Sequence, residues 1–269
     1  MSEASRTETD DQGTAVRLGP VRQVVSLVPS LTEALAATGP GLLVGATEWC
    51  THPAGLAVER IGGTKNPDVA RIIELGPALV VANEEENRAP DLAALRAAGI
   101  PVWVTEVRTL PQALSSLDRL LTVACRLPHP AWLDAAGAAW EAVEEPLTRL
   151  RAVVPVWRRP WMVLGRDTFA GDLLRRLGVD VIHADHAERY PAIPIAELLA
   201  AGPQLAVLPD EPYRFTATDG PEAFPGTPCA LVSGRHLTWY GPSLAEAPAV
   251  LTAQLRTAPG GRPCSDREA

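Results

Sequence analysis

The chain holds a single lysine, Lys65, and four cysteines that form no Cys-x-x-Cys pair. Cysteines so far apart are typical of unlinked thiols in a reducing compartment rather than of a disulfide framework. The formal net charge is −8 and no basic stripe occurs, which argues against nucleic acid as a partner. No segment approaches the run of about 20 apolar residues that a membrane-spanning helix needs, so no membrane insertion is predicted.

Enzyme signatures are also missing. The chain has no Gly-x-Ser-x-Gly, Walker loop, Gly-x-Gly-x-x-Gly or His-Glu-x-x-His motif, and we predict that it is not an enzyme. Cys50-x-His52 has a spacing that could place two ligands on one metal, and His236 is a further candidate. Because no third and fourth ligand lies within sequence reach, no dedicated metal site is predicted.

The first 20 residues do not have the pattern of a secretory signal. They are polar and acidic, without a basic start followed by an apolar run of about 7 to 15 residues. From this pattern we expect a cytoplasmic protein with a disordered N-terminal segment at 1–20. The residues at 259–269 are mostly Gly, Pro and charged residues, which predicts a disordered tail.

One pattern occurs twice in the chain, at 69–85 and at 195–211. Each copy is typical of a short amphipathic helix, a Gly-Pro stop, a buried apolar strand and an acidic loop. Two such segments predict two similar lobes, and two lobes predict a cleft between them. With 269 residues, 46% of them apolar, the chain is long enough for two separate cores.

Predicted strands and helices alternate in both halves, which favours mainly parallel sheets covered by helices on both faces. We expect the lobes at 21–127 and 157–258. Between them, at 128–156, apolar side chains recur at helical spacing and predict one long linking helix of roughly 35 Å. Pro146 lies inside this segment, so two shorter helices with a turn at Glu145-Pro146 are the alternative.

Ligands of open parallel sheets bind beyond the carboxyl ends of the strands. The turn at 165–168 is expected at this edge, together with loops that carry six aromatic side chains: Trp49, Tyr190, Tyr213, Phe215, Trp239 and Tyr240. Aromatic residues at loop tips offer flat faces to a planar ligand, or else pack beneath their own loops. The acidic residues at 84–86 and 210–211 are interpreted as solvated loop charge, with an acid/base pair or cation site as the alternative.

Four motifs in order resemble the helical-backbone periplasmic binding proteins. They lie at 25–33, 45–49, 62–68 and 75–80, and the likeness extends over about 22–255. Members of this family are the substrate-binding components of ABC importers for vitamin B12, haem and iron-siderophores, and this chain looks most like the cobalamin-binding branch. The resemblance implies an α/β fold of two Rossmann-like lobes with mainly parallel sheets, joined by one long backbone helix, with the ligand in a cleft between the lobes.

The resemblance also implies site residues. Pro29 and Ser30 match the turn after the first strand, and Trp49 and Tyr190 match aromatic positions that face the corrin in cobalamin receptors. Asn83 falls near another aromatic position. The expected ligand-binding residues are therefore Pro29, Ser30, Trp49, Asn83, Glu84, Tyr190, Tyr213 and Trp239.

Importer components of this family dock on their permease through one glutamate per lobe, and the matching positions here are Ala70 and Ala196. We therefore predict an intracellular, non-catalytic binding protein for a corrinoid-like or metal-chelate ligand: cobalamin first, with haem or an iron chelate as other candidates. One alternative is an importer component whose signal peptide is missing from this chain. The other is a chelatase-like or metal-dependent enzyme that uses the cleft between the lobes.

Overall fold

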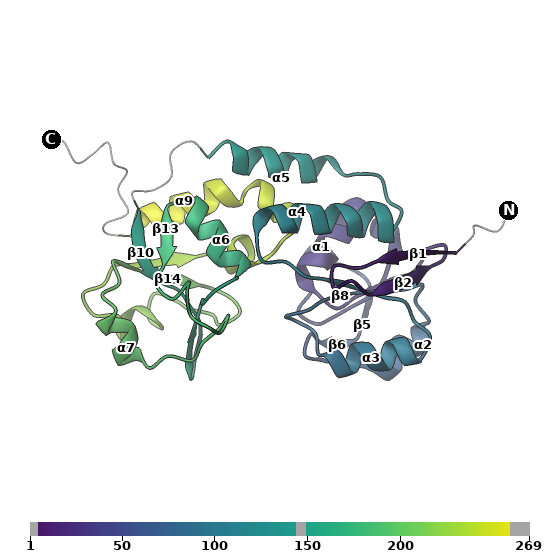
Figure 1. Ribbon diagram of the computed structural model, residues 1–269, viewed down its shortest axis with the longest axis horizontal. Coiled ribbons are helices and arrows are strands. Elements are labelled where there is room, and N and C mark those ends of the chain that lie inside the picture. The colour runs from purple at the N-terminus through teal and green to yellow at the C-terminus, as the bar shows by residue number, and fades with distance from the viewer. Residues whose placement is uncertain (1–4, 144–148, 259–269) are drawn as a thin grey trace. The chain divides into compact units, whose positions relative to one another are not determined.

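The computed structural model describes residues 5–143 and 149–258, and the chain divides into two compact units (Figure 1). The first unit consists of Met1–Val107, Pro111–Asp134 and Tyr240–Pro242, and the second of Arg108–Leu110, Ala135–Trp239 and Ser243–Ala269. Within the described residues, no helix combines the length and the apolar character needed to cross a membrane.

The first unit is built on a five-stranded sheet in the order β5-β4-β3-β8-β9, and every neighbouring pair is parallel. The strands are β3 (Val24–Ser26), β4 (Leu43–Ala46), β5 (Glu59–Arg60), β8 (Leu79–Asn83) and β9 (Val102–Thr105). All residues of β3, β8 and β9 are buried, as expected of parallel strands covered on both faces.

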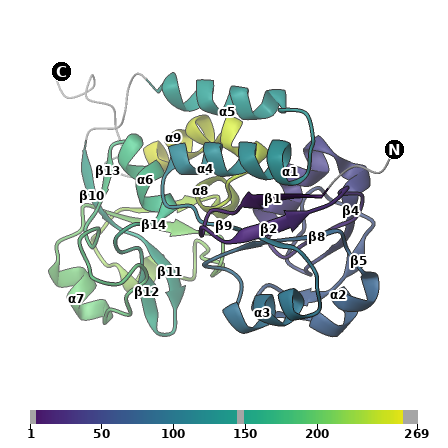
Figure 2. The same cartoon turned by 45° about the vertical axis from the view of Figure 1, so that its right-hand side comes forward.

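Helices cover this sheet on both sides, with α1 and α4 on one face and α2 and α3 on the other (Figure 2). They are α1 (Pro29–Thr38), α2 (Val69–Leu75), α3 (Ala89–Ala97) and α4 (Leu110–Asp118), and a π-helical turn at Arg119–Ala124 continues α4. A 3-10 turn at Pro40–Leu42 precedes β4, and β6 (Gly62–Gly63) and β7 (Asn66–Pro67) form a small hairpin.

The second unit has a four-stranded parallel sheet in the order β13-β10-β14-β15. Its strands are β10 (Leu150–Val153), β13 (Val179–Val181), β14 (Leu205–Pro209) and β15 (Cys229–Val232), and β11 (Pro155–Arg158) pairs with β12 (Trp161–Val163) in an antiparallel hairpin. Its helices are α6 (Phe169–Arg176), α7 (Ile195–Ala200), α8 (Gly234–Thr238) and α9 (Ala247–Thr257), with 3-10 turns at Pro221–Ala223 and Pro242–Ala245. The predicted α/β fold with two parallel sheets is confirmed.

The expected linking helix at 128–156 is shorter than predicted. Helix α5 (Ala131–Glu141) ends at Glu141, and Leu150–Val153 is strand β10, which pairs with β13 and β14 on its two sides. The apolar spacing continued past α5 because Leu150, Ala152 and Val153 are buried as strand residues. Over so short a segment, the apolar residues of a buried strand can match the spacing of the apolar residues of a helix. Pro146 and the alternative turn at Glu145-Pro146 lie outside the described residues.

The expectation of disorder at 1–20 is wrong for residues 6–18, which form an antiparallel hairpin of β1 (Arg6–Thr9) and β2 (Ala15–Leu18). Val16 and Leu18 are buried and alternate with exposed neighbours, so the hairpin has an apolar face. Its turn is closed by the Asp10 carboxylate, whose Oδ1 accepts from the backbone N–H groups at 12 and 14 at 3.0 and 2.8 Å. The expected tail at 259–269 lies outside the described residues.

Candidate functional site

Pro29 and Ser30 begin α1 directly after β3, at the carboxyl end of the first unit's sheet. A proline at the start of a helix leaves no intrahelical hydrogen bond unmade, which explains why α1 begins here. Both residues are buried, and Ser30 lies beside Tyr240, whose hydroxyl is 3.3 Å from Thr105 Oγ1. Burial first, and then the charge of Glu86, raise the pKa of Tyr240 well above its usual value. Ser30 and Tyr240 thus form part of a buried polar layer beneath this edge.

Trp49 lies on the loop after β4, and 66% of its surface is exposed. The loop is nevertheless anchored, because the backbone N–H of Glu48 donates to Gly62 O at 2.9 Å and Arg60 Nη1 donates to the carbonyls of Thr47 and Cys50, each at 2.9 Å. An exposed indole on a fixed loop is a ready surface for a flat ligand.

Cys50 and His52, the candidate metal ligands, follow Trp49 on the same loop. The Cys50 thiol is buried and accepts a hydrogen bond from Thr32 Oγ1 at 3.0 Å, and burial raises its pKa. A raised pKa disfavours the thiolate that binds metals. His52 Nδ1 is 3.1 Å from Thr51 Oγ1. Within residues 5–143 and 149–258, no three histidine, cysteine, aspartate or glutamate side chains come together as a metal site.

Asn83 ends β8 and is turned inward. Its Nδ2 donates to Thr105 O at 3.0 Å, and its Oδ1 accepts from the backbone N–H groups of Glu85 and Glu86 at 2.9 and 3.3 Å. The side chain is 3% exposed, so its polar atoms shape the acidic loop at 84–86. Glu84 is half-buried on that loop, and its backbone N–H donates to Thr105 O at 3.0 Å.

Tyr190 is half-buried on the loop that follows β13 in the second unit. This loop is clamped to the turn at 165–168, because Gly165 N donates to Arg189 O at 2.7 Å and Arg189 Nε donates to Asp167 O at 3.1 Å. A Cβ at Gly165 would lie 2.2 Å from Glu188 O, so only glycine permits this approach. The backbone on either side of Tyr190 is therefore held in place.

Tyr213 follows β14 and belongs to an aromatic group with Trp157 and Phe215. The Tyr213 ring is 4.7 Å from that of Phe215 and meets the ring of Trp157 edge-on at 5.7 Å, while its hydroxyl donates to Asp219 Oδ2 at 2.7 Å. Trp157, on the β11–β12 hairpin, is 43% exposed. Sequence reasoning missed Trp157, although a tryptophan beside arginines at a hairpin tip could have drawn attention to it.

Trp239 and His236 are less accessible than the sequence suggested. Trp239 is 7% exposed and hydrogen-bonds Glu211, whose pKa is raised by burial and by the charge of Asp210. Both ring nitrogens of His236 have partners, Ser233 Oγ at 2.7 Å and Glu246 Oε1 at 3.0 Å. These two side chains stabilise the segment around α8 rather than extend from it.

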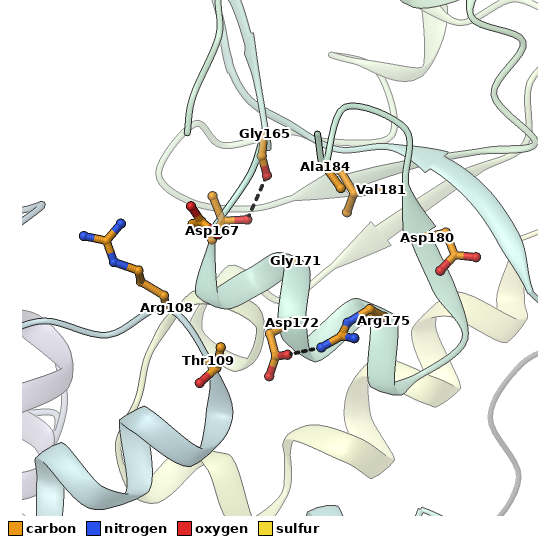
Figure 3. A pocket seen from close by; sticks show the side chains of 11 residues that line it. Arg108, Thr109, Gly165, Asp167, Gly171, Asp172, Arg175, Asp180, Val181 and Ala184 are labelled. Atoms are coloured by element: carbon orange, nitrogen blue, oxygen red, sulfur yellow. Dashed lines mark hydrogen bonds and ion pairs between the residues drawn. The ribbon is translucent and has the colours of Figure 1, made fainter. Parts of the chain in front are cut away.

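A cavity of about 250 Å³ lies in the second unit beside α6 (Figure 3). None of the predicted site residues lines it, although the turn at 165–168 was expected at this edge. It is lined by Arg108, Thr109, Gly165, Asp167, Thr168, Gly171, Asp172, Arg175, Asp180, Val181 and Ala184. Sequence reasoning could not find this cavity, because residues 108–109 are distant from the rest of its wall in the chain.

Among known proteins, the chain is similar to the vitamin B12-binding protein of Vibrio cholerae serotype O1, with 24% identity over 194 residues, 69% of this chain and 70% of that one. Its likeness to the vitamin B12-binding protein of Yersinia pestis (strain Pestoides F) is 26% over 198 residues, 69% of each chain. Both relatives are named as binding proteins, in agreement with the prediction that this chain is a binding protein and not an enzyme.

Solved structures share the fold. A periplasmic vitamin B12 binding protein of Vibrio cholerae superposes with a TM-score of 0.68 and 19% identity, over 86% of this chain and 94% of that one. A periplasmic heme-binding protein from Roseiflexus sp. RS-1 gives a TM-score of 0.69 and 20% identity, over 87% and 97%. The family model described as periplasmic binding protein matches residues 24–218. Since that match covers most of the chain, the protein belongs to the periplasmic binding protein family.

Proposed function

We propose that the protein binds a flat metal chelate of the corrinoid or porphyrin class, with cobalamin as the first ligand to test. The observation that carries the proposal is Trp49, which is 66% exposed on an anchored loop at the carboxyl end of the first sheet. A large aromatic side chain in water gains free energy when a flat apolar surface covers it.

The second unit supports the same ligand class. Tyr190 lies on a loop that Gly165 and Asp167 hold in place, so the backbone that carries its ring need not be ordered when a ligand stacks on it. The relatives by sequence are vitamin B12-binding proteins, and a heme-binding protein shares the fold. Corrin and porphyrin rings are both flat enough to stack on an indole or a phenol ring.

Titration of the purified protein with hydroxocobalamin, haemin and ferric chelates tests the proposal, with visible absorbance as the readout. We expect at least one ligand to bind in the micromolar range or tighter. Trp49→Ala and Tyr190→Ala should each weaken binding by about 1 to 3 kcal/mol without unfolding the protein, because each removes one aromatic contact. Trp132→Ala, on α5, is the matched control and should bind as the wild type does. If none of these ligands binds with a dissociation constant below the millimolar range, the proposal is refuted.

We further propose that the protein works inside the cell and does not dock on a permease. Ala70 on α2 and Ala196 on α7 are both exposed and uncharged, at the positions where importer components of the family carry a docking glutamate. Fractionation of the native cells with antibodies against the protein tests this. The protein is expected in the cytosolic fraction; its recovery with a membrane permease would instead favour the importer alternative.

A further inference from the structure

The β11–β12 hairpin of the second unit (Figure 2) is extended by a third segment, the one that carries Tyr190. Three backbone hydrogen bonds join this segment to β12 and the residues after it: Gly165 N donates to Arg189 O at 2.7 Å, Val163 N to Pro191 O at 3.1 Å, and Ile193 N to Trp161 O at 3.0 Å. Their spacing is that of an antiparallel pair. Residues 155–158, 161–165 and 189–193 therefore form a three-stranded antiparallel patch, with β12 in the middle.

One face of the antiparallel patch is packed into the core. That face carries Trp161, Val163 and Ile193, which belong to the buried cluster of the second unit or pack against it. The other face is given by the register, which pairs Trp157 with Met162 and Met162 with Ala192. Residues directly opposite one another share a face, and successive residues alternate between faces. Trp157, Met162 and Ala192 therefore form a row on the side away from the core, where each is exposed or half-buried.

Tyr190 belongs to the same face as this row. Its neighbours on either side in the chain bond to residues 165 and 163, so Tyr190 lies opposite Leu164 just as Ala192 lies opposite Met162. Alternation along the segment then places Tyr190 on the side of Ala192. The aromatic residue expected from the sequence and the one that the sequence did not reveal, Trp157, thus lie on one surface.

Trp157 is the largest side chain of this surface, and its strand is tied down. The Tyr213 ring meets the indole edge-on at 5.7 Å, and the Tyr213 hydroxyl donates to Asp219 Oδ2 at 2.7 Å. The next residue, Arg158, forms ion pairs with Asp219 and Glu222. Even so, 43% of Trp157 is exposed. A fixed apolar side chain with this much surface in water gains free energy when a ligand covers it.

The patch has the position and the width of a site for a ring ligand. Strand β11 follows the end of β10, and the Tyr190 segment follows the end of β13, so both lie beyond the carboxyl edge of the second sheet, where ligands of open parallel sheets bind. Neighbouring strands are about 4.8 Å apart, so the two outer strands of the patch are about 10 Å apart. A corrin or porphyrin ring is wide enough to reach from one to the other, whereas ferric citrate is not.

We propose that Trp157 is a further ligand-binding residue, and that the ring of the ligand lies across the row of Trp157, Met162 and Ala192 with Tyr190 at its far edge. The inference rests on the proposed function and narrows it to ligands that span both outer strands. The indole then covers one end of the ring and the phenol the other, and the small side chain of Ala192 lets the ring approach the patch closely.

Titration of the wild type, Trp157→Ala and Trp157→Phe with hydroxocobalamin and haemin tests the assignment. Trp157→Ala should weaken the binding of the ring ligand at least about fivefold, whereas Trp157→Phe should stay within about twofold because an aromatic face remains. Ala192→Glu, at an exposed position, should weaken binding at least about tenfold, because it places a carboxylate beneath an apolar ring. The matched control is Leu231→Ala on β15, which is 39% exposed in the same unit and should bind as the wild type does.

Hydroxyl-radical footprinting of the wild type distinguishes direct contact from an effect on folding. The bound ligand should protect Trp157 and Trp49 from oxidation and leave Trp132 unchanged. Protection of Trp49 without Trp157, or unchanged affinity in Trp157→Ala, refutes the inference and leaves the proposed function standing. A dimer of the unliganded wild type that Trp157→Ala converts to a monomer also refutes it, since a second copy would then cover the patch. If neither ring ligand binds the wild type, the proposed function fails, and the inference with it.

Discussion

Leu18→Ala should lower the free energy of unfolding of the first unit by about 3 kcal/mol, the usual loss when a buried leucine is truncated. Leu18 is completely buried, although it lies on the N-terminal hairpin. The matched control is Arg17→Ala, the preceding residue on the same strand, whose side chain is exposed and hydrogen-bonds only the exposed Ser5 among its described contacts. We expect Arg17→Ala to change the stability by less than about 0.5 kcal/mol.

The reason for so large an effect is that the hairpin is joined to the edge of the first sheet. Asp11 N donates to Val104 O at 3.2 Å, and Val104 N donates to Asp10 Oδ2 at 3.3 Å, so the turn of the hairpin pairs with edge strand β9. The Asp11 carboxylate also contacts Ser116 and Arg119. A covered edge strand is protected from pairing with other chains, so loosening the hairpin should also expose β9.

Hydrogen exchange of peptides from β9 and α4, measured at increasing urea concentration, is the appropriate readout because it reports on the first unit alone. Leu18→Ala should shift the unfolding of these peptides to lower urea and leave the peptides of β14 unchanged. Equal behaviour of the Leu18 and Arg17 variants would mean that the hairpin contributes nothing to the fold.

Much of the fold was predictable because the sequence repeats. The copy at 69–85 forms α2, β8 and the acidic loop, and the copy at 195–211 forms α7, β14 and the loop with Asp210. In both copies the glycine of the Gly-Pro stop has a left-handed backbone, with φ of 56° at Gly76 and 63° at Gly202. A helix that ends on such a glycine turns sharply into the next strand, and this local rule needs no tertiary information.

The hairpin and β10 escaped prediction for a different reason. Four-residue strands offer too few positions to separate alternation from chance, and β1 and β2 also carry the charges expected of a disordered segment. Strand β10 can be recognised only from its pairing with β13 and β14, which lie far from it in the sequence. Strand pairing decided both segments, with a neighbouring strand for the hairpin and with distant strands for β10.

The candidate site was predictable by position but not by side-chain orientation. The expected residues other than Trp239 follow or end a strand or begin the next helix, whereas Trp239 follows helix α8. Asn83 and Trp239 direct their polar atoms inward, to Thr105 and Glu211. A sequence shows which residues lie at the edge of a sheet, whereas the hydrogen bonds that turn them inward depend on neighbours from other strands. Trp49 differs because its anchoring bonds use the backbone and leave its ring exposed.

Asp172→Ala should destabilise the second unit by about 3 kcal/mol. The Asp172 carboxylate is almost completely buried and accepts from Leu110 N at 3.0 Å, as well as from Arg175 and Arg176 at 2.8 and 2.9 Å. Alanine would leave the buried N–H of Leu110 without its acceptor, which alone costs about 1 to 3 kcal/mol. The two arginines are partly exposed, so water replaces much of what they lose.

The loss of stability caused by Asp172→Ala should depend on pH, because only the ionised Asp172 carboxylate provides the full stabilisation. Burial opposes ionisation of Asp172, but the hydrogen bonds from Leu110 N and the two arginines outweigh it and hold the pKa of this carboxyl below its usual value. A group with a lowered pKa in the folded state stabilises the protein above the pKa of the unfolded chain, about 3.9, and loses that contribution as the pH falls through its folded pKa. The difference between wild type and Asp172→Ala should therefore be full at pH 7 and shrink below about pH 4.

Urea unfolding of the second unit at pH 7 and at pH 3, again by hydrogen exchange, measures both predictions. Asp172→Asn is the matched control, because it keeps the shape and one acceptor oxygen for Leu110 N but carries no charge. It should lie between wild type and Asp172→Ala at pH 7 and show little of the pH dependence. If Asp172→Ala loses as much stability relative to wild type at pH 3 as at pH 7, the ionised carboxylate is not the source of the stabilisation, and the segment at 108–110 must be held to α6 by packing alone.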